Sequence, residues 1–383
     1  MRTLIYLDHS ATTKPDAAIL QTFLAVNEDY WFNPASIHKG GDQAANLLER
    51  AREQVATLLK TPSKSVIFTS GGTEGNNYVL RGAEIATKSR GKHILVSSVE
   101  HPSVLETAKV LQNEGFDVEW IAVDSNGQVC LADLDRKVRN DTILVSIQHV
   151  NNEIGTIQPI VDSIDIIRTK SRAIIHMDAV QSYGKLQVDF DKYPVDWITL
   201  SSHKFHGIKG SGVAASRNHI TLPPYIHGGG QEHGHRSGTT PVAQAVSTAK
   251  SMRLAANEQQ ATFKHLDMLQ KELRKFFEEL SAVNILTPDI SAPHILTVAV
   301  RGVKGEVLVN ALEKREIYVS TSSACSSKKK GTSHVLEAMN LHSELIDGVI
   351  RISTGKHTSI EEIEQFKLHF THVMKQLERN VKS

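Results

Sequence analysis

The sequence lacks most features that mark membrane-spanning, secreted or nucleic-acid-binding proteins. No apolar run approaches the roughly 20 residues of a membrane span, and an acid, Asp8, follows the first apolar residues, so we expect no signal peptide. Only two cysteines, Cys130 and Cys325, occur among 383 residues, which excludes a disulfide framework and favours a reducing, cytoplasmic setting. The formal net charge is +1, and no basic stripe is interleaved with aromatic residues, so we expect no direct contact with nucleic acid.

The length and the hydrophobic pattern indicate an α/β protein with two domains. At about 150 residues per domain the chain is long enough for two, and it contains no internal repeat or low-complexity tract. Between residues 40 and 215, helical stretches alternate with nearly continuous apolar runs. These runs predict a mainly parallel sheet covered on both faces by helices. The expected strands are 66–69, 94–96, 118–121, 143–147, 173–177 and 197–200.

The remainder of the chain has a different texture. Residues 241–280 read as one long helix, and we expect the domain boundary near 255–285 because such a helix can join two domains. After Pro288, short apolar runs mix with helical patterns, which predicts a smaller α+β domain. Its expected strands are 295–300, 317–320 and 349–353, and its expected helices lie near 305–315 and 359–379.

Residues that suit an anion follow the first strand of the expected sheet. Ligands of open α/β sheets bind beyond the carboxyl ends of the strands. Here Ser70-Gly71-Gly72-Thr73 stands between a strand and a helix, so glycines allow close approach and the helix N-terminus offers free N–H groups. This pattern predicts a phosphate cup, and an ordinary tight turn capped by Thr73 is the alternative. No Gly-Lys-Ser/Thr follows, so it is not a Walker loop.

Four other strand ends carry polar side chains, and each of these side chains has a purely structural explanation beside the functional one. His101 suits stacking on a planar ring or proton transfer, and equally a helix cap. Asn152 suits hydrogen bonding to a ligand or a turn. Asp178 requires a partner because a buried unpaired carboxylate is costly, and a cationic ring nitrogen or a nearby Arg or Lys would serve. Lys204, in Gly-rich surroundings, suits Schiff-base chemistry, although most such lysines lie on the surface.

Taken together, these features predict a pyridoxal 5′-phosphate site. A phosphate cup, a ring-stacking histidine, a carboxylate for a pyridinium nitrogen and a Schiff-base lysine fall at the ends of strands of one expected sheet. They are the groups by which proteins hold this electron-sink cofactor.

Further motifs extend in order along nearly the whole chain. They are Leu7-Asp8-His9-Ser10-Ala11-Thr12-Thr13, Asn33-Pro34-Ala35-Ser36, residues 69–74, Glu100-His101, residues 149–155, 178–182 and 201–204, residues 228–232 and 236–239, Ser323-Ala324-Cys325-Ser326-Ser327, and Arg351. In these motifs the chain resembles the NifS/IscS-type cysteine desulfurases, a class V aminotransferase branch of the fold-type I pyridoxal phosphate enzymes. The resemblance implies a large cofactor-binding domain at 14–260 and a small domain formed by 1–13 and 261–383. Five positions depart from the commonest family pattern, namely His9, Gly75, Asn76, Ile208 and His233.

The resemblance also implies a role for each site residue. The catalytic residues would be Lys204, which anchors the cofactor and moves the substrate α-proton, Cys325, the nucleophile, and His101, which stacks on the ring. The substrate carboxylate would be held by Asn33 and Arg351, with Asn152 nearby. The cofactor-binding set would be Gly72, Thr73, His101, Asn152, Asp178, Gln181, Ser201, His203, Lys204 and, across a dimer interface, Thr239.

Cys325 also stands out by its surroundings. A reactive thiolate needs exposure and a depressed pKa, and Cys325 lies among small polar residues with three lysines at 328–330. Cys130, between Val129 and Leu131, has the apolar neighbours of a structural cysteine. The lysines could favour the thiolate, attract an acidic sulfur acceptor or form a solvated loop edge.

The function implied by the resemblance is conversion of L-cysteine to L-alanine by a homodimer. Sulfur would pass to Cys325 as a persulfide and then to an acceptor in iron–sulfur cluster assembly, tRNA thiolation or DNA sulfur modification. A selenocysteine lyase or another class V enzyme is the alternative activity, and an inactive scaffold is disfavoured by Lys204 and Cys325. A metal-binding module would have to use His227, His233 and His235, but their spacing matches no zinc site, so we expect no metal.

Overall fold

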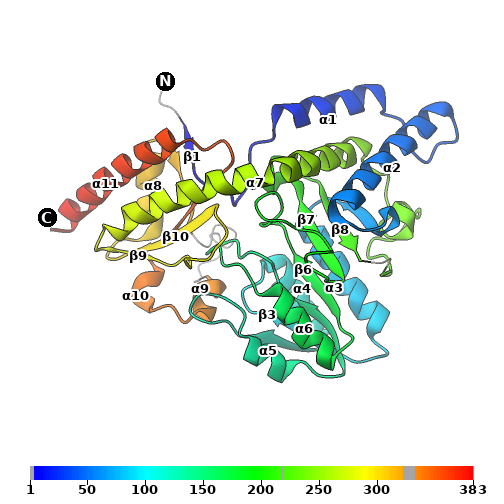
Figure 1. The fold of residues 1–383 in the computed structure, drawn as a ribbon, viewed down its shortest axis with the longest axis horizontal. Helices are drawn as coiled ribbons and strands as arrows, with labels where there is room; N and C mark the ends of the chain where they lie inside the picture. The colour runs from blue at the N-terminus through cyan, green and yellow to red at the C-terminus, as the bar shows by residue number, and fades with distance from the viewer. Residues whose placement is uncertain (1–3, 218–219, 322–332, 383) are drawn as a thin grey trace.

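A seven-stranded sheet forms the centre of the larger part of the molecule (Figure 1). The computed structural model describes residues 4–217, 220–321 and 333–382. Strands β3 to β7 run parallel, as the sequence predicts, and β8 is antiparallel to both of its neighbours. In sheet order the strands are β2 (Val66–Thr69), β8 (Gly212–Ser216), β7 (Trp197–Ser201), β6 (Ile174–Asp178), β5 (Thr142–Ser146), β3 (His93–Ser97) and β4 (Asp117–Ile121).

Strand β8 is the element of this sheet that the sequence did not reveal. Its residues are small, and they follow a Gly-rich stretch that reads as a loop. The strand lies between β2 and β7, where space is limited: a Cβ added at Gly212 would lie 2.6 Å from the carbonyl oxygen of Leu200. Close backbone packing therefore selects the small residues that hide the strand from a propensity argument.

Helices cover both faces of the sheet. One face packs against α3 (Gly72–Thr87) and α4 (Pro102–Asn113), whose apolar side chains form one core cluster with alternate strand residues. The other face packs against α2 (Lys39–Leu59), α6 (Ile160–Lys170) and the first half of α7 (Val242–Glu278). Helices α1 (Ala17–Asp29) and α5 (Leu131–Lys137) and the 3-10 turns η1 (Ser63–Ser65), η2 (Ser202–Lys204) and η3 (Glu232–Gly234) complete this part.

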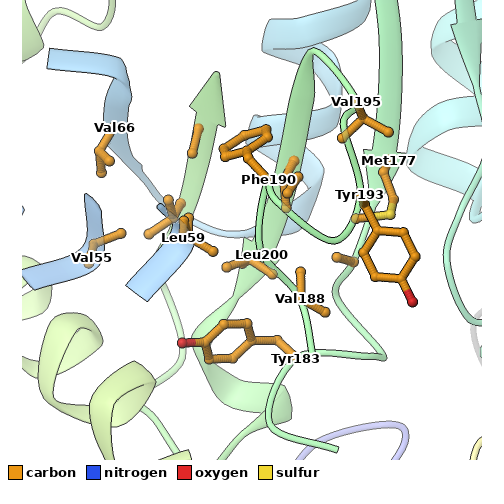
Figure 2. Packing of buried hydrophobic residues seen from close by; sticks show 14 of the residues in the cluster. Val55, Leu59, Val66, Met177, Tyr183, Val188, Phe190, Tyr193, Val195 and Leu200 are labelled. Atoms are coloured by element: carbon orange, nitrogen blue, oxygen red, sulfur yellow. The ribbon is translucent and has the colours of Figure 1, made fainter. Parts of the chain in front are cut away.

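The core cluster on the face covered by α2, α6 and α7 is built from segments far apart in sequence. Figure 2 shows Val55 and Leu59 of α2 near Val66 of β2, and Phe190 and Val188 of the β6–β7 connection over Leu200 of β7. These side chains are all buried. The connection between β6 and β7 thus contributes apolar side chains to the core in place of a long helix.

A smaller unit follows along the chain, and its core is separate. Its three-stranded antiparallel sheet has β10 (Ile295–Val300) between β12 (Val349–Ser353) and β9 (Val283–Ile285). Helices α8 (Gly305–Glu313) and α11 (Ile360–Lys382) contribute to its core, while β1 (Ile5–Tyr6) pairs with β11 (Ile317–Tyr318). The short helices α9 (His334–Ala338) and α10 (Ser343–Ile346) complete it.

Helix α7 connects the two cores. Its first half places Val242, Ala243, Ala245, Ala249 and Met252 in the core of the large sheet, and its second half places Leu269, Leu273 and Phe277 in that of the small one. Figure 1 shows the helix running along both parts. Ile5 and Leu7 from the N-terminus belong to the small core. This distribution supports the division at residues 14 and 260, which remains a prediction. No helix among the described residues has both the length and the apolar character needed to cross a bilayer.

A buried ion pair joins α2 to the loop before α7. Arg52 donates to Glu232 at 2.6 and 2.9 Å, both side chains are 2% exposed, and Glu232 also accepts from the backbone N–H of Phe68. Removing one member of such a pair leaves the other charge buried without its counter-ion.

We therefore expect Glu232→Gln to lower the free energy of unfolding by about 3–5 kcal/mol in a urea titration. Glu49→Gln is the matched control, because Glu49 also contacts Arg52 at 3.1 Å but is 44% exposed. Its expected loss is below about 1 kcal/mol. Equal losses for the two variants would show that the buried pair carries no special stability.

Candidate active site

One cavity of about 230 Å³ lies at the carboxyl edge of the large sheet, as the strand-end argument predicts. It contains most residues of the expected site, although they come from distant segments. Those that line it are Gly72, Thr73, His101, Asn152, Asp178, Gln181, Ser201, His203, Lys204 and Arg351.

The glycine-rich turn forms a concave wall beside this cavity. Gly71 has φ 149°, which favours glycine, and Gly72 begins α3. A Cβ added at Gly72 would lie 2.9 Å from Cγ2 of Val180, so the backbone comes closer here than a side chain would allow. Ser201, the last residue of β7, also lines this wall. Free N–H groups of the helix N-terminus and nearby hydroxyls suit a phosphate.

Asp178 ends β6 and is held by two donors. The side-chain amide of Asn76 donates to one carboxylate oxygen at 2.7 Å, and the backbone N–H of Val180 donates to the other at 2.9 Å. The same amide donates to Ser103, whose hydroxyl lies 2.8 Å from Nδ1 of His101. Sequence reasoning noted Asn76 only as a departure from the family pattern. Asn76 is a polar residue that is only 1% exposed. A polar residue on the buried face of a helix is the signal that could have revealed it.

His101 caps the N-terminus of α4, which confirms the capping alternative, while stacking on a planar ring stays a prediction. Its Nδ1 accepts a hydrogen bond from the backbone N–H of Ser103 at 3.1 Å, while the ring lines the cavity. Burial lowers the pKa of His101, and the carboxylate of Asp178 opposes that change. A neutral ring with a fixed orientation follows, which suits contact with a planar ligand.

Lys204 lies at the end of η2, directly after β7. Its Nζ donates to the carbonyl oxygens of Ser10 and, at 2.8 Å, Ala11. The buried Lys185 donates to the carbonyl oxygen of Lys204 at 2.6 Å. Burial lowers the pKa of Lys185 to about 7, and the charge of Lys204 adds to this effect. The N-terminal segment therefore positions the lysine amine, a contact that strand-end reasoning did not provide.

The same N-terminal segment also contacts His203 and Gln181. Burial lowers the pKa of His203 to about 3, and its Nδ1 lies 3.1 Å from the hydroxyl of Thr12. The side-chain amide of Gln181 donates to the carbonyl oxygen of Ser10 at 2.9 Å, and its oxygen lies 3.3 Å from Nε2 of His294.

Arg351 enters the cavity from β12 and is already oriented. Its guanidinium donates to Asp8 at 2.9 Å and to the carbonyl oxygen of Asn152 at 2.9 Å. Burial raises the pKa of Asp8, and the charge of Arg351 opposes that rise. Asp8 is quoted in the N-terminal motif, but nothing in the sequence assigned it to Arg351.

Two expected residues do not line this cavity, and a third lies outside the described residues. Asn33 is exposed, and its side-chain oxygen accepts from the backbone N–H of Ala35 at 2.9 Å. Thr239 is exposed too, and neither residue lines the cavity, so within one chain their expected contacts are absent. Cys325 and the lysines at 328–330 lie outside the described residues.

Two of the three histidines considered for a metal contact other side chains. Nδ1 of His235 lies 3.2 Å from the hydroxyl of Tyr78, and Nε2 of His233 lies 3.9 Å from Glu49.

Comparison with known proteins decides the family. Residues 5–366 match the model of the aminotransferase class-V family. The chain belongs to the class-V aminotransferases. Within that family it is 40% identical over 370 residues to a cysteine desulfurase IscS of Vibrio vulnificus, covering 95% of this chain and 91% of the relative.

Two solved structures share the fold. A NifS-like protein superposes with a TM-score of 0.92 at 37% identity, over 97% of this chain and 100% of the other. A structure described as SspA in complex with cysteine has a TM-score of 0.81 at 30% identity, over 93% and 100%.

Enzymes of this family depend on pyridoxal 5′-phosphate, and the cavity fits that group. The glycine cradle and α3 N-terminus suit the phosphate, Asp178 suits a protonated ring nitrogen, and Lys204 supplies the amine.

Proposed function

We propose that this protein is a cysteine desulfurase that converts L-cysteine to L-alanine and passes sulfur through Cys325 to an acceptor. The observation that carries the proposal is the convergence of Lys204, Asp178, His101 and Arg351 on one cavity. The cysteine desulfurase relative and the cysteine-bound structural neighbour support the choice of substrate.

Each residue around the cavity has a separate role in the proposed reaction. When bound, pyridoxal phosphate supplies an electron sink that stabilises negative charge at the substrate Cα. Asp178 holds a proton on the ring nitrogen, and Asn76 keeps that carboxylate in place. Lys204 accepts the α-proton at Nζ, and the carbonyl oxygens that now bind this atom hold it at the cavity. His101 covers the ring and excludes water from it.

Sulfur transfer is assigned to the thiolate of Cys325. The thiolate attacks the substrate sulfur, an S–S bond forms, and the Cβ–S bond of the substrate breaks. The three-carbon product takes up protons and leaves as alanine, while Cys325 retains the sulfur as a persulfide. Cysteine plus the enzyme thiol therefore give alanine plus the persulfide, and no outside oxidant is needed. A second thiol acceptor regenerates the enzyme.

The assembly and the setting are parts of the same proposal. We place Thr239 and Asn33, both exposed, at the site of a second copy of the chain, which would make the enzyme a homodimer. The acceptor is a thiol protein of iron–sulfur assembly, tRNA thiolation or DNA sulfur modification. Two cysteines in 383 residues fit a reducing, cytoplasmic setting.

The direct test is product analysis with purified holoenzyme and two substrates. We expect L-cysteine to give alanine in a one-to-one ratio with sulfur recovered as persulfide or sulfide. Alanine from L-selenocysteine but not from L-cysteine would replace the proposal with selenocysteine lyase. Amino-group transfer to a keto acid, with no alanine from cysteine, would indicate a transaminase.

The substrate carboxylate provides a prediction with a defined geometry. A guanidinium binds a carboxylate through two parallel hydrogen bonds, whereas an ammonium group cannot, and such charged bonds are each worth about 1.5–3 kcal/mol. We expect Arg351→Lys to raise KM for L-cysteine about 10–100-fold with a smaller change in kcat. Arg315→Lys is the control, because Arg315 is a half-buried arginine that bonds to Gln376 and does not line the cavity. An unchanged KM in Arg351→Lys would remove Arg351 from the substrate site.

A further inference from the structure

A second set of potential ligand atoms lies behind the lysine turn, outside the cofactor cavity. It consists of Asp16, His206 and His357, whose ligand atoms all lie within 4.8 Å of one another. Asp16 directly precedes α1, His206 is the second residue after η2, and His357 lies in the turn between β12 and α11. The proposed function uses none of the three.

The distances are close to those of a metal site. Oδ1 of Asp16 lies 3.1 Å from Nε2 of His357 and 3.9 Å from Nδ1 of His206. Ligand atoms bonded to one tetrahedral Zn²⁺ lie roughly 3.3 Å apart. Two imidazoles with one carboxylate, and an open position for water, form a ligand set that zinc accepts.

The backbone holds the ligands in place before any ion arrives. The backbone N–H of Asp16 donates to the carbonyl oxygen of His206 at 3.0 Å, which ties two of the three ligands together. His206 has φ 62°, a left-handed conformation that is rare for a residue other than glycine. The backbone N–H of Thr358 bonds to Gly355 at 3.0 Å and closes the turn that presents His357.

An adjoining cavity supplies an independent observation. This cavity, of about 30 Å³, is lined by Asp16 and His206 and also by His9 and His294. Nδ1 of His9 and Nδ1 of His294 are both buried, and neither has a hydrogen-bond partner in the described part of the chain. His294 is 2% exposed. Both residues line a space large enough for water, and buried nitrogens without a protein partner are satisfied by a water or another ligand.

Neighbouring charges set the cost of binding. The ammonium group of Lys356 donates to Oδ2 of Asp16 at 2.7 Å and to Glu258 at 2.9 Å, so the local charge of these three groups is −1. Oδ1 of Asp16 lies 3.1 Å from Nε2 of His357, and an ion bound by both atoms would replace that contact. Nδ1 of His206 lies 3.0 Å from the carbonyl oxygen of Lys14, and metal binding through that atom would replace this contact.

A second cluster in the described chain, His93 with Asp117 and Glu119, lacks such an opening. Arg139 already bonds to Asp117 and lies 3.5 Å from Glu119, so a fixed cation occupies the carboxylates.

We propose that Asp16, His206 and His357 form a binding site for one divalent cation of the zinc class. The ion would fasten the start of α1, the turn after Lys204 and the β12–α11 turn to one another. This site does not depend on the proposed desulfurase activity.

The test is calorimetric titration of the holoenzyme with ZnCl₂, in a Cys325→Ala background that removes the reactive thiol. We expect one equivalent of Zn²⁺ to bind, and His357→Ala to weaken binding at least about tenfold. His342→Ala is the matched control, because His342 is 72% exposed and His357 is 65% exposed. Affinity in His342→Ala should equal that of the parent.

His206→Asn provides a second variant, since asparagine tolerates a positive φ. It should weaken Zn²⁺ binding as His357→Ala does, and both should abolish the rise in thermal midpoint that Zn²⁺ causes in the parent. Absence of saturable binding overturns the proposal. So does unchanged affinity in either ligand variant, or an equal loss in His342→Ala. Cofactor absorbance in the same samples reports on the proposed function separately.

Discussion

Lys204→Ala should reduce alanine formation from L-cysteine by at least about 10³-fold, because one residue both anchors the cofactor and moves the α-proton. A positioned general base alone contributes about 10²–10⁴-fold. The amine is held by the carbonyl oxygens of Ser10 and Ala11 at the cavity wall, and among the described residues no other lysine lines that cavity. Initial rates of alanine release, with cofactor in excess, measure the effect.

The control must show that the loss belongs to this lysine. Lys170→Ala removes an exposed lysine that pairs with Asp135, and it should leave the rate unchanged. Retention of more than a tenth of wild-type activity in Lys204→Ala would assign the proton transfer to another group.

Cys325→Ala should eliminate persulfide and sulfide formation while the cofactor stays bound. The substituted residue lies outside the described residues, and every described group that lines the cofactor cavity is kept. We measure persulfide on the protein by mass spectrometry after incubation with L-cysteine, and the bound cofactor by its visible absorbance. The substitution should remove the first signal and leave the second unchanged. The wild-type protein should show both, and the variant should show only the absorbance.

Cys130→Ala is the matched substitution for this experiment. Cys130 is a free, half-buried cysteine that precedes α5, far in sequence from every cavity residue. It should support sulfur transfer at the wild-type rate. If Cys325→Ala desulfurates cysteine normally and Cys130→Ala does not, the nucleophile has been assigned to the wrong thiol.

The ends of the strands were predictable from the sequence, because an apolar run and the polar residues that directly follow it are local signals. The runs that end near Thr69, Ser97, Asp178 and Ser201 became β2, β3, β6 and β7, and their polar residues meet at one edge. The parallel arrangement then brings them together by topology alone. The long helix predicted at 241–280 is α7 (Val242–Glu278).

Contacts between distant segments were not predictable in this way. Asp8 meets Arg351, and Asn76 meets Asp178, across separations of 343 and 102 residues. No local pattern encodes either pairing. Strand β8 escaped because its small residues are selected by close packing. Asn33 and Thr239 were expected at the site from resemblance, and a single chain does not bring them there.

The central claim is that the amine of Lys204 carries the cofactor. Borohydride reduction of the purified holoenzyme, followed by peptide mass spectrometry, tests it most directly. The visible absorbance should disappear, and a pyridoxyl mass should be found on the peptide that contains Lys204, in one copy per chain. A colourless protein that stays colourless after incubation with pyridoxal phosphate, or the added mass on any other lysine, would contradict the claim.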